Sequence, residues 1–136
     1  MLSPFYWPEP LSEVAQAFMR RYADLAVSDL VEVEFFSALG RRVREGDIGD
    51  DSARRITALF LSHLEDGRFD RIPLERAHYV TARAWLSGFL VVAQTLDALH
   101  LAVAANHDLE IATADGGMAR AAKALGLRVH HVRRKT

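Results

Sequence analysis

Residues 96–129 read LDALHLAVAANHDLEIATADGGMARAAKALGLRV, and this stretch decides the fold because two kinds of element alternate within it. Residues 96–106 are almost all apolar, which predicts a mostly buried helix. Three further elements are predicted: a strand over 109–113, a helix over 114–125 and a strand over 127–132. Alternating helices and strands predict an α/β fold with a parallel sheet and a ligand site at the carboxyl ends of the strands.

The alternation extends toward the N-terminus. The predicted elements are helices over 11–22, 28–45, 51–65 and 75–94 and strands over 25–27 and 69–74. Ser28 or Asp29 is expected to cap the helix over 28–45, with Glu32 placed for a capping box. Residues 1–10 contain three prolines and are predicted to form an irregular aromatic lead-in. Its Phe5-Tyr6-Trp7 cluster is expected to pack on the protein's own helices, although stacking on bases is the alternative.

Composition narrows the classes of function. A chain of 136 residues fits one domain, taken here as 1–136 with a polar tail over 133–136, and it has no cysteine for a disulfide, a thiol nucleophile or a zinc–thiolate site. The net charge of −1 does not suit a protein that coats nucleic acid by bulk electrostatics. No stretch is apolar enough to span a membrane and the N-terminus does not resemble a secretion signal, so a cytoplasmic protein is expected.

Three carboxylates lie in apolar surroundings. Glu34 is on a helix, Asp97 opens the apolar helix and Asp115 follows a strand directly. Each has an ordinary structural explanation: Glu34 could pair with a neighbouring arginine, and the two aspartates could be helix caps. Three acids gathered in one small domain would repel one another unless a hard cation neutralised them. Carboxylate clusters suit Mg²⁺ or Mn²⁺, which activate water for phosphodiester hydrolysis.

Other motifs carry less information. The six histidines lack metal-ligand spacing and are interpreted as surface or satisfied core residues. Arg41 and Arg42 could contact RNA phosphates, although basic residues on a solvated helix face are the default. The sequence has no Walker A loop, no GxGxxG after a strand and no GxSxG elbow, which argues against nucleotide-cofactor and serine-hydrolase functions.

The order of motifs resembles the PIN-domain family, in particular the toxin ribonucleases of VapBC toxin–antitoxin systems. The resemblance is carried by the segments SDLVEVEFFSALGRR (28–42), LDALHLAVA (96–104) and TADGGMARAAKALGLRV (113–129). It implies that Glu34, Asp97 and Asp115 are catalytic, metal-binding acids for Mg²⁺ or Mn²⁺, with Glu32 the competitor for Glu34. It also implies an RNA substrate, a cognate VapB-like antitoxin and a homodimer, for which the first two helices offer apolar surfaces.

One departure from the family pattern is expected to matter. The family opens with a central strand that ends in an aspartate, and by the resemblance both would lie upstream of Met1. About four strands are therefore expected, without the central one, and the chain would need a shifted strand or dimerisation to compensate. Two explanations are open: a start assigned too late, or a genuine, impaired product.

The alternative function is a PIN-like module that binds RNA or antitoxin without cutting. A DNA nuclease of the same superfamily is less favoured because the chain leaves no room for accessory parts.

Overall fold

A computed structural model describes residues 5–8 and 25–132 of the chain. The strands are β1 (Phe5–Tyr6), β2 (Leu25–Ser28), β3 (Phe69–Ile72), β4 (Ile111–Thr113) and β5 (Val129–His131). The helices are α2 (Asp29–Arg44), α3 (Asp50–Glu65), α4 (Arg76–Ser87), α5 (Thr95–Asn106) and α6 (Gly116–Ala124). The predicted helix over 11–22 and the tail over 133–136 lie outside the described residues.

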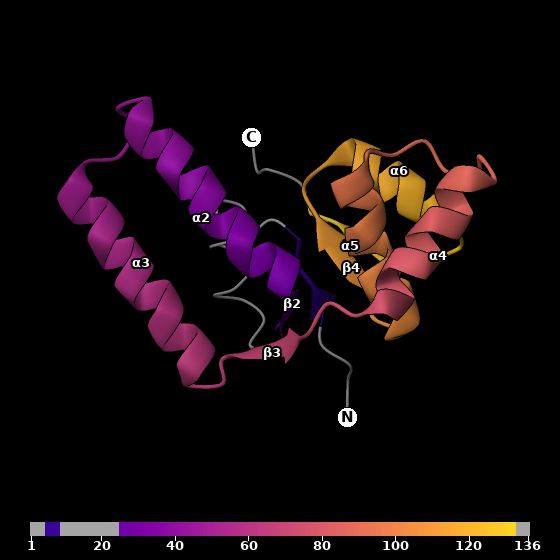
Figure 1. Cartoon of the computed structure of the whole chain (residues 1–136), viewed down its shortest axis with the longest axis horizontal. Coiled ribbons are helices and arrows are strands. Elements are labelled where there is room, and N and C mark those ends of the chain that lie inside the picture. The colour runs from indigo at the N-terminus through magenta and orange to yellow at the C-terminus, as the bar shows by residue number, and fades with distance from the viewer. Residues whose placement is uncertain (1–4, 9–24, 133–136) are drawn as a thin grey trace.

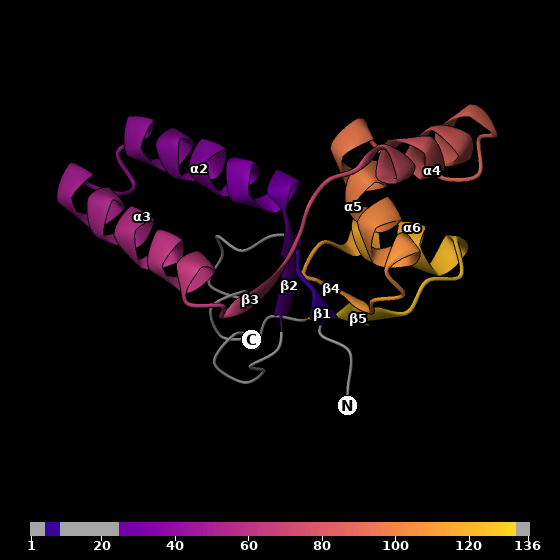
Figure 2. The same cartoon turned by 60° about the horizontal axis from the view of Figure 1, so that its bottom comes forward.

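The strands form one parallel sheet in the order β3-β2-β1-β4-β5. Figures 1 and 2 show α2 and α3 beside the β2–β3 half of the sheet and α4, α5 and α6 beside the β4–β5 half. The prediction of an α/β fold with a parallel sheet is confirmed. The crossovers bring the carboxyl ends of β1, β2 and β4 to one edge, which is where the site is expected.

The expectation that the central strand is missing is wrong. Residues 5 and 6, assigned to an irregular lead-in from the sequence, form β1 and pair with Leu25 and Ala26 on one side and with Ile111 on the other. The Tyr6 amide donates to the Glu110 carbonyl at 2.9 Å, and the Trp7 amide donates to the Ala26 carbonyl at 3.1 Å. Aromatic residues favour strands and bury large areas, so this short segment fills the gap that two unpaired strand edges would leave.

The N-terminal aromatic cluster belongs to the core. Tyr6 and Trp7 are 0% and 1% exposed, and they pack with residues of both halves of the sheet and of the helices around it. The prediction that the cluster packs inside its own fold is therefore confirmed, and stacking of these two rings on bases is excluded by their burial.

The remaining elements lie close to their predicted positions, with two differences. Ser28 caps α2 by accepting a hydrogen bond from the Val31 amide, but Glu32 pairs with Arg71 on β3. The second difference is the end of α4, which stops at Ser87 and not at residue 94. Gly88 caps α4, and Phe89 follows in a left-handed conformation with φ of 54°, so the apolar residues after it form a loop.

No helix among the described residues is both long enough and apolar enough to cross a membrane.

Candidate metal and nuclease site

The three predicted acids line one pocket of about 330 Å³. Glu34 comes from the second turn of α2, Asp97 from the first turn of α5, and Asp115 from the turn between β4 and α6. The pocket is completed by Pro8, His100, Ala114 and Met118. The fold therefore brings together side chains that are far apart in the sequence, at the edge of the sheet where parallel strands end.

Glu34 lines the acid pocket, and its competitor Glu32 does not. The Glu32 carboxylate accepts two hydrogen bonds from the Arg71 guanidinium, at 3.0 Å from Nε and 2.9 Å from the second nitrogen. It does not line the pocket, whereas Glu34, two residues further along the helix, does. The reason is helical geometry, because residues i and i+2 point to different faces.

The surroundings of Asp97 disfavour the ionised form of its carboxyl group. Burial raises the pKa of its carboxyl, the negative charges of Asp115 and Glu34 raise it further, and His100 opposes them. This pattern of burial with like charges is typical of functional sites, where a cation or a proton relieves the repulsion.

Asp115 has a structural role as well as its place in the pocket. Its Oδ1 caps α6 by accepting hydrogen bonds from the amides of Gly117, at 2.8 Å, and Met118, at 3.3 Å. Its own amide donates to the Thr113 hydroxyl at 3.0 Å. The capping bonds fix the carboxylate at the mouth of the pocket, so the alternative interpretation as an N-cap is correct and does not compete with a role in the site.

A hydrogen-bonded chain of buried side chains ends at Glu34, and sequence reasoning missed it. The Tyr6 hydroxyl lies 2.9 Å from Ser28 Oγ and 2.6 Å from His100 Nδ1, and His100 Nε2 lies 2.5 Å from Glu34 Oε1. The histidine was interpreted as a satisfied core residue, and it is 2% exposed and fully bonded. The available signal was its position three residues after Asp97 on an otherwise apolar helix, which places both side chains on one face.

The predicted RNA-contacting arginines lie away from these acids. Arg41 and Arg42 are exposed in the last turn of α2, and neither lines the pocket. A second concavity of about 440 Å³ shares Asp97, Asp115 and Met118 with the acid pocket and continues toward Val92 and Gln94. The acids therefore stand in a cleft that extends along the loop between α4 and α5.

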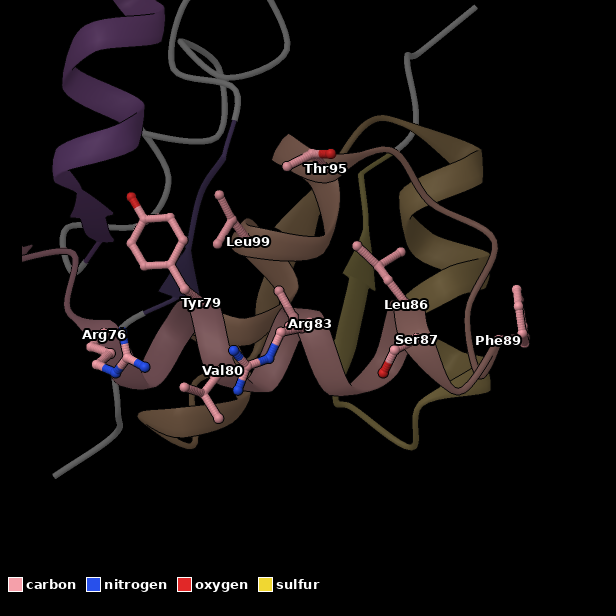
Figure 3. Close-up of a pocket in the computed structure, with 10 residues that line it drawn as sticks. Arg76, Tyr79, Val80, Arg83, Leu86, Ser87, Phe89, Thr95 and Leu99 are labelled. Atoms are coloured by element: carbon pink, nitrogen blue, oxygen red, sulfur yellow. The ribbon is translucent and has the colours of Figure 1, made fainter.

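A larger pocket, of about 670 Å³, lies between α4 and α5 and differs in chemistry. Figure 3 shows that it is lined by side chains of these two helices and of Phe89 in the loop that follows α4. The described residues that line it are mainly apolar, with Arg76 and Arg83 on α4, and include no carboxylate. Because it lacks acids, this pocket does not offer the oxygen ligands that a hard cation needs.

The acid pocket fits a divalent cation in the kind of ligand it offers. Glu34, Asp97 and Asp115 supply carboxylate oxygens, and none of the described residues that line the pocket is an arginine or a lysine. As placed, however, no three His, Asp or Glu side chains of the described residues are close enough together to hold one ion. The donor set is suitable for Mg²⁺ or Mn²⁺, and side-chain rotation is needed to close it around an ion.

The comparison with protein families agrees with this arrangement. A PIN domain model matches residues 2–124, so the chain belongs to the PIN domain family. No curated protein matches the sequence. The match begins before β1, in agreement with the sheet order, in which Phe5–Tyr6 form the central strand.

Solved structures share this fold at low sequence identity. FitAcB from Neisseria gonorrhoeae is 17% identical with a TM-score of 0.63, over 93% of this chain and 96% of that one. A toxin–antitoxin complex from Klebsiella pneumoniae is 16% identical with a TM-score of 0.64, over 98% and 100% of the two chains. VapBC2 from Rickettsia felis, bound to a DNA fragment from its promoter, is 12% identical with a TM-score of 0.62, over 93% and 98%. These likenesses concern the fold.

Proposed function

We propose that the protein is a metal-dependent endoribonuclease, the toxin of a type II toxin–antitoxin system. The observation that carries the proposal is the convergence of Glu34, Asp97 and Asp115 on one pocket at the carboxyl edge of a PIN-type sheet. The structural neighbours from Klebsiella pneumoniae and Rickettsia felis, described as a toxin–antitoxin complex and as VapBC2, support the toxin assignment.

In this proposal the three carboxylates hold Mg²⁺ or Mn²⁺ and face the scissile phosphate of an RNA. When bound, such an ion would supply Lewis-acid activation of water and charge stabilisation for phosphodiester hydrolysis. Asp97 or Asp115 accepts the proton of the attacking water.

The proposed partners follow from the same assignment. An RNA is the substrate, with Arg41 and Arg42 as outlying phosphate contacts, and a VapB-like antitoxin directs a basic side chain toward the acids. Among the described residues, the pocket is lined by three carboxylates and by no arginine or lysine, so it is complementary to an arginine guanidinium. We also propose that the protein forms a homodimer and is located in the cytoplasm.

A second candidate is a PIN-like module that binds RNA or an antitoxin without cutting. Pro8 favours it, because this residue lines the pocket just after the end of β1 and offers no side-chain oxygen to a cation. The acids of the described residues also do not converge on one ion as they are placed. Three ligands hold a hard ion weakly, so this candidate predicts metal binding only at millimolar concentration.

The deciding experiment is an RNA cleavage assay on the full chain with Mg²⁺ or Mn²⁺, compared with Asp97→Asn. The substitution removes one negative charge and preserves shape, so we expect cleavage to be lost without loss of folding. The control is Asp70→Asn, which changes an exposed carboxylate on β3 outside the pocket and should leave cleavage unchanged. Equal cleavage by the wild type and Asp97→Asn would overturn the nuclease proposal.

The binding-module candidate is tested with the same proteins. It predicts no metal-dependent cleavage by the wild type, but retention of RNA or antitoxin binding by Asp115→Ala. A large loss of partner affinity in that variant would contradict it.

A further inference from the structure

We infer that Tyr6 and His100 are positioning residues for Glu34, holding one oxygen of its carboxylate so that the other faces the pocket. The inference rests on the proposed function, because it concerns how Glu34 is presented to a divalent cation. Its basis is the chain of hydrogen bonds from Ser28 through Tyr6 and His100 to Glu34.

When Glu34 is a carboxylate, which can only accept hydrogen bonds, counting hydrogens along this chain gives a direction to each bond. The Val31 amide donates to Ser28 Oγ, so the serine hydroxyl is free to donate to the Tyr6 oxygen. The Tyr6 hydroxyl then donates to His100 Nδ1, which leaves the proton of a neutral imidazole on Nε2. From Nε2 that proton is donated to Glu34 Oε1.

The donation to Glu34 is the same if the imidazole carries a second proton. The Nδ1 proton would then be donated to the Tyr6 oxygen, and the tyrosine hydroxyl would turn toward Ser28. Burial raises the pKa of Tyr6 well above its usual value, so the tyrosine keeps its hydroxyl proton in both arrangements. The orientation of Glu34 therefore depends on the presence of the two rings and not on their protonation.

Burial makes this arrangement rigid. Ser28 and Tyr6 are 0% exposed and His100 is 2% exposed, whereas the Glu34 side chain is 34% exposed. The Glu34 side chain is thus hydrogen-bonded to a group of buried side chains that come from β1, β2 and α5. Among the described residues, Glu34 Oε1 has His100 as its partner and Oε2 has none, which leaves Oε2 available for a ligand.

The Tyr6 ring comes from the central strand, which gives that strand a second use. Tyr6, at the end of β1, has no carboxylate, but it determines how the Glu34 carboxylate on α2 is oriented. Groups that hydrogen-bond to ligating carboxylates tune metal affinity, and their loss costs about 10–100-fold.

The test measures Mn²⁺ affinity of the full chain by calorimetry, or by the electron paramagnetic resonance signal of free Mn²⁺, for the wild type and five variants. His100→Leu removes the donor, and we expect affinity about 10–100-fold weaker than the wild type. Tyr6→Phe removes only a hydroxyl, keeps the ring and should weaken binding in the same direction. His100→Gln places an amide N–H near the former Nε2 and should recover part of the loss.

The matched control is His78→Gln. His78 is also 2% exposed and fully bonded, but it lies on α4 outside the acid pocket. The His78→Gln substitution should lower the free energy of unfolding without changing Mn²⁺ affinity. It therefore shows whether a loss of Mn²⁺ affinity comes from the position of Glu34 or from lower stability. If His100→Leu does not fold, Tyr6→Phe and His100→Gln carry the test.

The outcomes distinguish the two proposals. If Glu34→Gln abolishes Mn²⁺ binding but Tyr6→Phe and the His100 variants bind as the wild type does, the positioning role is wrong and the metal site stands. If the wild type does not bind Mn²⁺, the proposed function fails and the inference fails with it. Weakened binding in Tyr6→Phe and His100→Leu, with His78→Gln unchanged, supports the inference.

Discussion

Asp115 combines two tasks in one side chain. Oδ1 is committed to the amides at the start of α6, and the same carboxylate lines the acid pocket. Asparagine caps a helix about as well as aspartate, whereas alanine does not cap. The two tasks can therefore be separated by choosing the substitution.

Asp115→Asn is expected to keep the free energy of unfolding within about 0.5 kcal/mol of the wild type, and Asp115→Ala to lower it by about 1 kcal/mol. Both should lose metal-dependent RNA cleavage, because both remove the negative charge. Urea denaturation and the cleavage assay measure the two effects. Full cleavage by Asp115→Asn would show that the carboxylate serves only as a cap.

Three acids that share one pocket could be singled out from the sequence, because a carboxylate in an apolar stretch is conspicuous and the family resemblance favoured Glu34 over Glu32. The support around Glu34 could not, since Tyr6 and His100 are 94 positions apart and meet only through the sheet. An apolar helix with one histidine does not reveal what that histidine contacts. The pairing of Glu32 with Arg71, 39 positions away, was hidden for the same reason.

At the scale of elements, α4 and α5 are joined by a pair of histidines. The Glu75 amide donates to His78 Nδ1 at 2.9 Å, and His78 Nε2 lies 3.0 Å from His107 Nε2. Because Nδ1 accepts, the proton of a neutral His78 is on Nε2 and is donated to His107. Adding a proton to His78 Nδ1 or to His107 Nε2 breaks one of these bonds.

This pair predicts a pH dependence of stability. Burial lowers the pKa of His78 below 6.5, the charge of His107 lowers it further, and Glu75 opposes them. A lowered folded-state pKa means that the unfolded chain binds more protons, so this contribution to stability is complete above pH 6.5 and declines as pH falls below it. The difference in urea midpoint between the wild type and His78→Gln should shrink from pH 7.5 toward acid. A constant difference would contradict this assignment.

The loop after α4 stores a small strain. Phe89 has φ of 54° and is 91% exposed, so its backbone conformation is unfavourable and its ring contributes little burial. A left-handed conformation costs an ordinary residue about 1–2 kcal/mol, and glycine avoids that cost but loses about 0.5–1 kcal/mol in entropy. Phe89→Gly is therefore expected to raise the free energy of unfolding by up to about 1 kcal/mol.

Urea denaturation of Phe89→Gly measures this effect, with Leu90→Gly as the neighbouring control. Leu90 does not share the positive φ, so glycine there should be destabilising. Equal destabilisation by both substitutions would show that Phe89 is not strained.

Most elements could be predicted from sequence because their patterns are local. The strands β2 to β5 and the helices α2, α3, α5 and α6 follow from apolar runs, periodicity and terminal glycines such as Gly46 and Gly126, both at positive φ. The end of α4 was missed because apolar residues continue past Gly88 without a helix. Strand β1 was missed because two residues carry no periodicity, and its hydrogen bonds are to Ala26 and Glu110.

For the whole molecule, the sheet depends on β1. Its two residues separate β2 from β4, and Trp7 next to them is 1% exposed in the core. Trp7→Ala is expected to lower the free energy of unfolding by about 3–5 kcal/mol, a large part of the stability of a small domain. Trp85→Ala is the matched control, because Trp85 is only partly buried and should cost less. Urea denaturation compares the two, and a smaller effect at Trp7 would show that the N-terminal segment is dispensable.

The central position of β1 also has a consequence for synthesis on the ribosome. Tyr6 is translated more than a hundred residues before Ile111, which lies on one of its two neighbouring strands. A nascent chain therefore cannot complete the sheet until β4 and β5 have been translated, and contacts of such long sequence separation form slowly. Asp115 follows β4 in the chain, so the three acids assemble only after β4 has been translated.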